Sequence, residues 1–242
     1  MNRLVLMVLR NFWKVPGAYG KLCHYAKHTD QYPEEEKYRH IRYILKTAVE
    51  SGNIDFQVNG EENIPVQNGY MMFANHQGMF DILAIVAAHE RPLAVVLKKE
   101  LYKIPLLKQM VICTKSYPMD REDIRQSMKV IQAVAEEVKS GRNYLIFPEG
   151  TRSKNKNQML EFHSGSFKCA TKAKCPILPI ALIDTYKVLD QKGSLPITVQ
   201  LHFLEPIAYE EYKDLNTTEL AKMVKARIEK TVSEKAYCDI WK

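Results

Sequence analysis

The chain lacks an apolar run long enough to cross a lipid bilayer. A membrane-spanning helix needs about 20 consecutive, mostly apolar residues, and the longest such run near the N-terminus, Leu4–Leu9, is far shorter. The same region has no small-residue cleavage site of the kind that ends a secretory signal peptide. The sequence therefore predicts neither a transmembrane helix nor a secretory leader.

Paired cysteines are also lacking. The five cysteines form no CxxC motif, and their number is odd. A chain of 242 residues can bury a sizeable core without disulfides, so we expect reduced thiols in a cytosolic compartment. His24 and His28 have the spacing of two metal ligands, but no third ligand accompanies them. We expect no metal site and no cofactor.

Acidic excess is absent too, because the formal net charge is +7. A solvated basic surface, nucleic-acid binding, or attraction to anionic lipids and phosphorylated substrates would each account for this charge. No homeodomain, zinc-finger or RNA-recognition signature is present, so we do not expect nucleic acid as a partner.

Residues 1–52 differ in character from the rest and are expected to form two helices. The first, roughly Arg3–His28, mixes apolar and aromatic side chains with basic ones and should break or kink at Pro16-Gly17. The second begins near Pro33, where three glutamates suit the positive end of a helix dipole. Apolar side chains then recur at helical spacing.

Two interpretations of this helical pair fit, and both can hold on different faces. The pair can pack as a hairpin on the rest of the chain. It can also lie in a membrane interface, with Phe12, Trp13 and leucines in the lipid and basic side chains at the headgroups. An anionic membrane surface is then the expected partner of residues 1–52.

From residue 53 to residue 242 the pattern alternates between strands and helices. Seven strands are predicted, at 56–58, 70–74, 93–97, 111–114, 144–147, 177–183 and 197–203. Helices are predicted at 80–89, 123–139, 166–173 and 218–235. This order indicates an α/β fold, with a single mixed, largely parallel sheet covered by helices and preceded by the N-terminal helical hairpin.

The segment Asn75-His76-Gln77-Gly78-Met79-Phe80-Asp81 places an imidazole five residues before a carboxylate. It follows the apolar run 70–74, so a strand can end there and a helix can begin near Asp81. Such a turn brings the carboxylate to one ring nitrogen of His76 and leaves the other free to accept a proton. Neither Ser nor Cys is placed nearby as a nucleophile, which suggests that the group to be activated belongs to the substrate.

A lone His-x4-Asp pair is common by chance, but a second motif accompanies it. Phe147-Pro148-Glu149-Gly150-Thr151-Arg152-Ser153 follows another apolar strand, at the end where α/β folds bind ligands. Gly150 lets the backbone approach a ligand closely, and Arg152 offers a planar fork that suits a phosphate. Taken alone, the motif also fits a polar loop with a solvated arginine.

Two further segments complete the pattern. Lys98-Lys99-Glu100-Leu101 and the later Asp120-Arg121 bring more cations after predicted strands. The segment 175–180 is an apolar strand bracketed by prolines, and Pro179 within it indicates a sheet edge or a bulge.

In this order, the four elements resemble the glycerolipid acyltransferases of the 1-acylglycerol-3-phosphate acyltransferase (PlsC-like) family. The resemblance covers about residues 70–184, and the NHxxxxD and FPEGTRS blocks match residue for residue. The block between them matches less well. Residues 114–119 replace its usual glycine and aromatic-hydrophobic run, although Asp120-Arg121 remains, and Cys169 stands where a glycine often follows Phe-Lys.

The resemblance implies an enzyme that transfers a fatty acyl group from acyl-ACP (acyl carrier protein) or acyl-CoA to the sn-2 hydroxyl of lysophosphatidic acid. The product is phosphatidic acid, for phospholipid biosynthesis, and no acyl-enzyme is expected. We expect His76 to act as general base and Asp81 to orient it. The candidates for substrate binding are Lys99, Arg121, Glu149, Gly150, Thr151 and Arg152.

Since donor and product are amphiphiles, we expect the protein at the cell membrane, peripheral or monotopic on its cytoplasmic face. Other interpretations stay open at this point. They are an acyltransferase for glycerol 3-phosphate or another lysolipid, a thioester hydrolase that uses the same His-Asp pair with water, and a lipid-binding module without catalysis.

Overall fold

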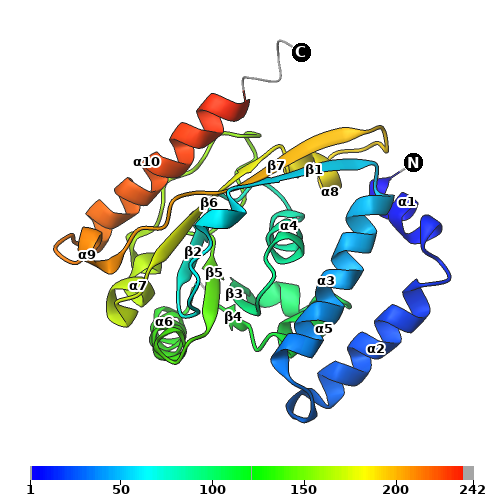
Figure 1. The fold of residues 1–242 in the computed structure, drawn as a ribbon, viewed down its shortest axis with the longest axis horizontal. Coiled ribbons are helices and arrows are strands. Elements are labelled where there is room, and N and C mark those ends of the chain that lie inside the picture. The colour runs from blue at the N-terminus through cyan, green and yellow to red at the C-terminus, as the bar shows by residue number, and fades with distance from the viewer. Residues whose placement is uncertain (1, 121, 237–242) are drawn as a thin grey trace.

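The computed structural model describes residues 2–120 and 122–236 (Figure 1). At its centre lies a seven-stranded sheet with the strand order β1-β7-β6-β2-β5-β3-β4. In this described part, neighbouring strands are parallel except for β6 and β7, which are antiparallel. The predicted single, mixed, largely parallel sheet is thus confirmed. The strands are β1 (Ile54–Asn59), β2 (Met71–Ala74), β3 (Leu93–Lys98), β4 (Tyr117–Met119), β5 (Asn143–Ile146), β6 (Ile177–Ile183) and β7 (Ile197–Phe203).

Helices cover both faces of the sheet, as Figure 1 shows. The α-helices are α1 (Arg3–Arg10), α2 (Val15–Lys27), α3 (Glu34–Ser51), α4 (Asp81–Ala88), α5 (Leu107–Cys113), α6 (Ile124–Lys139), α7 (Lys168–Ala173), α8 (Tyr186–Leu189), α9 (Tyr209–Tyr212) and α10 (Thr217–Ala236). Short 3₁₀ turns are η1 (Thr29–Gln31), η2 (Glu61–Asn63), η3 (Lys99–Lys103) and η4 (Ser164–Phe167).

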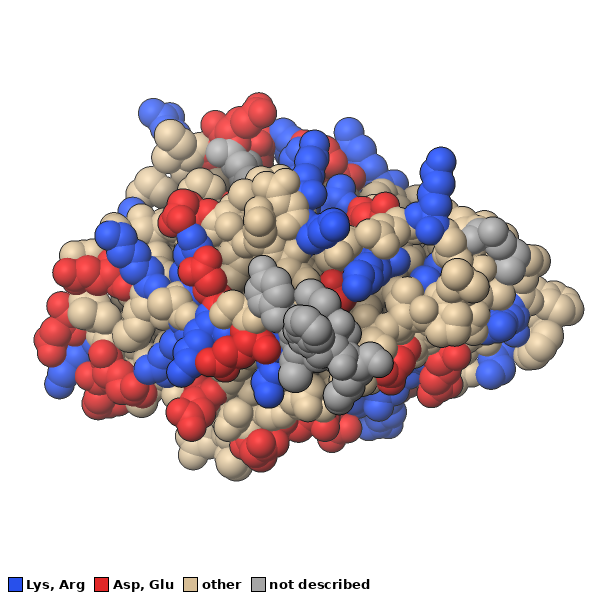
Figure 2. All heavy atoms as spheres, turned by 90° about the horizontal axis from the view of Figure 1, so that it is seen from above, with Lys and Arg blue, Asp and Glu red and all other residues tan. Residues whose placement is uncertain are grey.

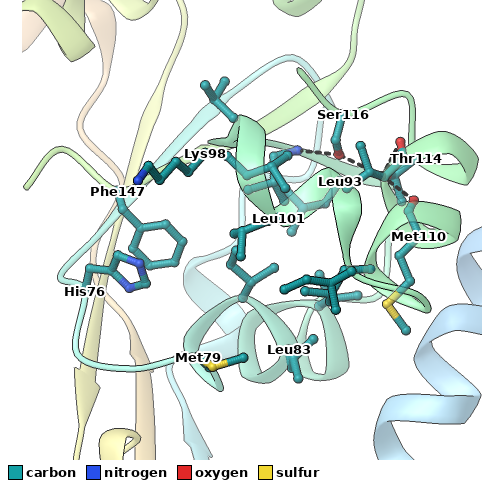
Figure 3. A pocket seen from close by; sticks show the side chains of 18 of the residues that line it. His76, Met79, Leu83, Leu93, Lys98, Leu101, Met110, Thr114, Ser116 and Phe147 are labelled. Atoms are coloured by element: carbon teal, nitrogen blue, oxygen red, sulfur yellow. Dashed lines mark hydrogen bonds between the residues drawn. The ribbon is translucent and has the colours of Figure 1, made fainter. Parts of the chain in front are cut away.

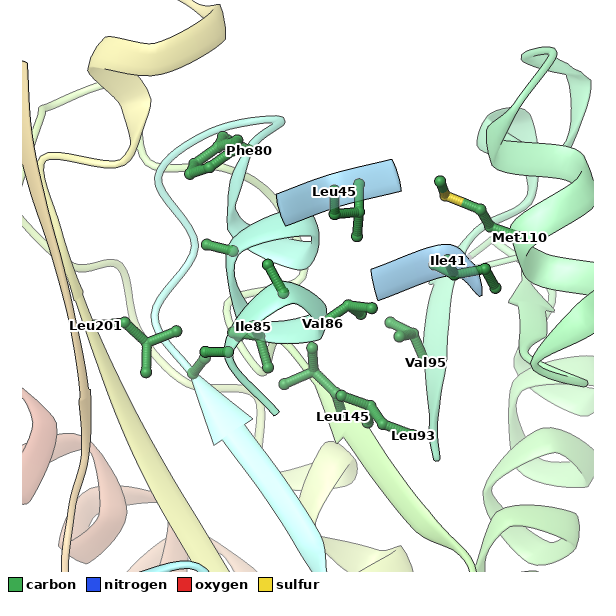
Figure 4. Packing of buried hydrophobic residues seen from close by; sticks show 14 of the residues in the cluster. Ile41, Leu45, Phe80, Ile85, Val86, Leu93, Val95, Met110, Leu145 and Leu201 are labelled. Carbon is green, nitrogen blue, oxygen red and sulfur yellow. The ribbon is translucent and has the colours of Figure 1, made fainter. Parts of the chain in front are cut away.

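The buried side chains form two hydrophobic clusters, one on each face of the sheet. Strand β2 contributes to both, because alternate side chains of a strand point to opposite faces. Met72 and Ala74 join α2, α3, α4 and α5 in the first cluster, whose packing Figure 4 shows. Met71 and Phe73 join α6, α7 and α10 in the second. Burial on both faces explains why β2 reads as a continuous apolar run.

The N-terminal helices form as predicted, but the break between α1 and α2 comes earlier than Pro16-Gly17. Helix α1 ends at Arg10, and Pro16 lies in the first turn of α2, where its missing N–H costs no intrahelical hydrogen bond. Side chains of α2 and α3, including Leu22 and Tyr38, are buried in the same cluster as α4. The hairpin therefore packs on the sheet domain.

The predicted strand at 111–114 is wrong, because these residues lie in and just after α5. A short apolar run has no period that separates a strand from a buried helix. The chain turns at Lys115, whose φ is +49°, and the strand comes later, as β4. Strand β4 lies at the edge of the sheet, which accommodates Pro118.

Pro179 in β6 was expected to mark a sheet edge or a bulge. Strand β6 lies inside the sheet, and a bulge is present next to this position. Ile177 pairs with Ile207, yet Ile180 pairs with Phe203, so the pairing register between β6 and the segment 203–207 shifts by one residue. Within the described ranges, none of the helices combines the length and apolarity that crossing a membrane requires.

Candidate active site

His76 lies in the turn between β2 and α4, at the carboxyl end of the sheet's parallel strands. Its Nδ1 is 2.7 Å from Oδ2 of Asp81, the first residue of α4. The turn predicted from the sequence therefore brings these two side chains together. The imidazole stacks on the ring of Phe147, with ring centres 4.2 Å apart.

The carboxylate of Asp81 is fully buried and held from several sides. Its Oδ2 also accepts hydrogen bonds from the backbone N–H groups of Gln77, at 2.6 Å, and Gly78, at 2.9 Å. Its Oδ1 accepts a hydrogen bond of 2.6 Å from the hydroxyl of Thr185. Because both oxygens are bonded, the carboxylate has a single orientation, and so does the ring that it contacts.

The backbone of His76 is fixed as firmly as its ring. Its N–H donates to Oε1 of Glu149 at 2.7 Å, and its carbonyl accepts from the N–H of Ser153 at 2.8 Å. Nε2 of the ring has no hydrogen-bond partner among the described residues, and the side chain lines a cavity. The arrangement presents one basic nitrogen to whatever occupies that cavity.

Glu149 joins the two sequence motifs. Its second oxygen, Oε2, accepts from the N–H of Leu160 at 2.9 Å, and the side chain is buried. Desolvation raises the pKa of this carboxyl above its usual value. Both oxygens bond backbone N–H groups, so Glu149 holds the His76 turn against the loop after β5.

Gly150, Thr151 and Arg152 follow Glu149 and line the same cavity as His76. Gly150 has a φ of +70°, and a Cβ there would lie 3.0 Å from the ring of His163, so glycine suits this position. The Arg152 guanidinium is partly exposed and donates from Nη1 to Oδ1 of Asp190 at 2.7 Å. Oδ2 of Asp190 accepts from the N–H of Met79 at 2.9 Å.

The remaining predicted cations lie in different places. Lys98, at the end of β3, lines the cavity. Lys99 is outside the lining and pairs with Oδ2 of Asp120 at 2.5 Å. This hydrogen bond raises the pKa of Lys99 and lowers that of Asp120. Arg121 lies outside the described residues.

The cavity that these side chains border has a volume of about 450 Å³. Figure 3 shows His76 and Phe147 at one end of it and Met110, Thr114 and Ser116 at the other. Between the two ends the lining is almost entirely apolar. It is formed by Ile41, Leu45, Ile82, Leu83, Val86, Leu93, Val95, Leu97, Leu101, Ile104, Leu107 and Val111. Its shape and lining suit a long hydrocarbon chain whose polar end meets His76.

Three residues that support the site were assigned no role from the sequence, although Asn75 is the first residue of the NHxxxxD motif. Asn75 pairs through its side chain with both backbone groups of Leu182, at 2.8 and 2.9 Å. Thr185 and Asp190 follow β6 and are more than a hundred residues from their partners Asp81 and Met79. The sequence marks Thr185 and Asp190 only by their position after the carboxyl end of a strand, and many polar residues have such a position.

The described cysteines take no part in the site. Burial raises the pKa of Cys113 to about 11 and that of Cys175 to about 12, so both are neutral thiols near pH 7. Cys169 is buried as well, and Cys238 lies outside the described residues. Within residues 2–120 and 122–236, no three His, Cys, Asp or Glu side chains gather as a metal site would require.

Comparison with known proteins places this geometry in a family. A family model described as Acyltransferase matches residues 55–183. The 1-acyl-sn-glycerol-3-phosphate acyltransferase of Saccharomyces cerevisiae is 30% identical over 76% of this chain and 62% of its own length. The enzyme of the same name from Borreliella burgdorferi is 26% identical over 75% of this chain and 74% of its own length.

A solved structure is similar over nearly the whole chain. It is the 1-acyl-sn-glycerophosphate (LPA) acyltransferase PlsC from Thermotoga maritima, which aligns with a TM-score of 0.77 and 25% identity. The alignment covers 96% of this chain and 95% of the other. Since the family model spans more than half of the chain and includes both the His76 turn and the Arg152 loop, the protein belongs to the acyltransferase family.

Proposed function

We propose that the protein transfers a fatty acyl group from an acyl thioester to the sn-2 hydroxyl of 1-acylglycerol 3-phosphate, giving phosphatidic acid. The names of its relatives from yeast and Borreliella describe enzymes of this kind. One observation carries the proposal: His76 and Arg152 lie together at the polar end of a cavity whose remaining lining is apolar. A lysolipid combines the matching groups, because its free hydroxyl lies between a phosphate and a hydrocarbon chain.

The reaction follows from the position of the base. Nε2 of His76 removes the hydroxyl proton while the oxygen attacks the thioester carbonyl. The new C–O bond forms, the C–S bond breaks, and the departing sulfur takes the proton from the imidazolium. Asp81 keeps Nδ1 protonated and stabilises the charged ring. A general base contributes about 10²–10⁴-fold, and the rest of the acceleration comes from holding two substrates together.

No acyl-enzyme is needed in this scheme. Among the described residues, none places a serine, threonine or cysteine side chain in hydrogen-bond contact with His76. Thr114 and Ser116 line the cavity, but their hydroxyls bond each other at 2.7 Å at the end away from His76. The acceptor's own hydroxyl then takes the place that a nucleophilic side chain has in a hydrolase.

The phosphate is assigned to the cations at the mouth of the cavity. Arg152 offers a forked pair of donors, one of which bonds Asp190 in the unliganded protein. Lys98 lines the same cavity and adds a point charge. Gly150 and Thr151 border the same space, and Lys99 and Arg121 remain proposed phosphate contacts. Glu149 acts on the substrate indirectly, by fixing the turn that carries His76.

We also propose that residues 1–52 attach the catalytic domain, residues 53–242, to the cytoplasmic face of the cell membrane. In Figure 2, the end of the molecule that carries α1 and α2 shows mostly tan atoms with scattered blue ones. The apolar side chains exposed on these helices and the turn between them are Leu4, Val5, Val8, Leu9, Phe12, Trp13, Val15 and Tyr19. Such a surface, with nearby Arg10 and Lys14, suits an anionic bilayer interface.

Arg3 does not belong to this surface. Its guanidinium is buried and donates to the carbonyls of Gly52, at 2.6 Å, and Leu195, at 2.8 Å. Together with the buried faces of α2 and α3, this contact makes deletion of residues 1–52 a poor test, because deletion would open the core. Replacing Phe12 and Trp13 with serine, at positions that are 63% and 64% exposed, leaves the core intact. The variant should bind anionic vesicles more weakly, and unchanged binding would defeat the membrane proposal.

The activity is tested with the purified full chain, 1-oleoyl-glycerol 3-phosphate, and either acyl-CoA or acyl-ACP. We expect phosphatidate by mass spectrometry in the wild type and its near-complete loss in His76→Ala. Release of free fatty acid without an acceptor would indicate a hydrolase instead. Near-normal transfer by His76→Ala, or an acyl adduct on any side chain during turnover, would overturn the mechanism.

A further inference from the structure

A second cavity, of about 970 Å³, lies beside the first. Its walls come from α6 and α7, which cover the face of the sheet opposite to α4 and α5. The two cavities meet at the carboxyl ends of β3 and β5. The residues that line both are Val96, Leu97, Lys98, Phe147, Gly150 and Thr151.

The second cavity is more polar than the first and has two distinct walls. On α6, Ile124 and Met128 are 72% and 64% exposed although both are apolar. On α7, Lys168, Thr171 and Lys172 line the same cavity. Nζ of Lys172 donates to Gln132 of α6 at 2.5 Å, so the two helices are linked across one side of the cavity. The lining therefore joins an apolar stripe to a pair of lysines on α7. Carboxylates line the same cavity on the side of β3 and β5, namely Glu100, Asp120, Glu122 and Glu149; of these, Glu100 pairs with Lys98 and Asp120 with Lys99.

The proposed reaction, on which this inference rests, requires two substrates at one base. His76 and Arg152 line the first cavity and are absent from the lining of the second. The acceptor's hydroxyl and phosphate consequently belong to the first cavity. The thioester carbonyl has to come within about 3–3.5 Å of that hydroxyl. A donor in the second cavity reaches it at the shared rim of Lys98, Phe147 and Gly150.

We infer that the second cavity binds the 4′-phosphopantetheine arm of the acyl donor. This arm is common to acyl-CoA and acyl-ACP. It has a thioester at one end, two amides in the middle, and a dimethyl group that lies next to the phosphate at the other end. The dimethyl group fits the apolar stripe of Ile124 and Met128. The phosphate fits Lys168 and Lys172, since lysine binds phosphate as a compact point charge.

The test compares steady-state KM values of the full-length wild type with those of Lys168→Glu and of the double variant Lys168→Glu, Lys172→Glu. Lys168 is the first residue of α7 and its side chain has no hydrogen bond to a described residue, so glutamate suits the helix dipole there and folding should be retained. Lys129→Glu is the matched control, because Lys129 is exposed on α6 and lies outside the lining.

We expect the KM for acyl-CoA and for acyl-ACP to rise about ten-fold in the double variant, as loss of charge-assisted phosphate contacts implies. The KM for lysophosphatidate should stay within about two-fold of the wild-type value, as should every parameter of Lys129→Glu. An N-acetylcysteamine thioester lacks the phosphate, and wild type and variant should use it equally well. A rise with one donor alone would still support the cavity and would identify which carrier it serves.

Two results would overturn the inference. One is a rise in the KM for lysophosphatidate with the donor KM unchanged, which would give the second cavity to the acceptor. The other is unchanged KM for every substrate. If the wild type transferred from none of the thioesters, the proposed function itself would fail. Calorimetric binding of free coenzyme A to wild type, compared with the double variant, would then still decide whether the cavity holds the arm.

Discussion

The two halves of the candidate site differ in how firmly the protein holds them. His76 and Asp81 are fixed by backbone N–H groups, by Thr185 and Glu149, and by stacking on Phe147. Arg152, by contrast, is partly exposed and held by a single exchangeable ion pair. A base has to be oriented before the substrate arrives, because its geometry determines the rate. A phosphate anchor works by changing partners, so a looser fixation suits it.

The largest effect is expected from the rigid half. In Asp81→Asn the side chain keeps its size, but its amide cannot both accept the three hydrogen bonds and hold Nδ1 of His76 as a donor. We expect kcat to fall by about 10²–10⁴-fold, with little change in the KM for lysophosphatidate. Thr185→Val, which removes only one of the bonds to Asp81, should lose less. A rise in the KM for lysophosphatidate as large as the fall in kcat would show that Asp81 also contributes to substrate binding.

A substitution in the loosely held half, at Arg152, should change the KM for lysophosphatidate. Arg152→Ala removes the forked donor, and a charge-assisted hydrogen bond is worth about 1.5–3 kcal/mol. The KM for lysophosphatidate should therefore rise by roughly 10- to 100-fold, with kcat nearly unchanged. Lys154→Ala is the control, because Lys154 is exposed in the same loop and outside the cavity lining. A fall in kcat at constant KM would mean that Arg152 acts in the transition state instead.

Glu149→Gln sharpens the comparison because it weakens the support of the His76 backbone and leaves the imidazole and Asp81 unchanged. Both carboxylate oxygens accept backbone N–H bonds, and the amide of glutamine can accept at one end only. The loss of one buried acceptor should lower the free energy of unfolding by about 1–3 kcal/mol. Chemical denaturation with urea measures this quantity. A variant as stable as the wild type would show that the His76 turn is held by its other contacts.

The smallest effect is expected from Asp190→Asn, and its sign is informative. If Arg152 binds the phosphate as proposed, Asp190 competes with the phosphate for it, and a partly exposed ion pair is worth about 0.2–1 kcal/mol. Asparagine keeps an acceptor for the N–H of Met79 but removes the negative charge. The KM for lysophosphatidate should fall by about two- to five-fold. A rise in KM would instead show that Asp190 positions the guanidinium for the phosphate.

The sequence predicted the rigid half better than the loosely held one, for a physical reason. His76 and Asp81 are joined by a local turn, so their spacing already contains the geometry. Lys98 and Lys99 are neighbours, and only the path of β3 into η3 decides that Lys98 lines the cavity while Lys99 pairs with Asp120. Asp190 follows β6, whereas its partners Met79 and Arg152 follow β2 and β5. No local sequence pattern encodes a contact between such distant segments.

The same distinction applies to the fold. Apolar runs with flanking turns are enough to predict most of the strands. Asp123, the first residue of the helix predicted at 123–139, caps α6 by accepting a hydrogen bond from the N–H of Gln126. The prediction for 111–114 is wrong because a run this short and mostly apolar shows no period that distinguishes a strand from a helix. Tertiary packing, in the form of α2 and α3 against α5, settles the conformation of this run.

The rim formed by Lys98, Gly150 and Thr151 bears on how substrates enter the protein and products leave it. Since the two cavities open on opposite faces of the sheet and meet at this rim, neither proposed substrate has to pass through the other's space. On that assignment the released thiol and the new lipid depart by separate routes. The thiol returns toward α6 and α7, while the lipid stays among the helices that carry the proposed membrane-binding surface.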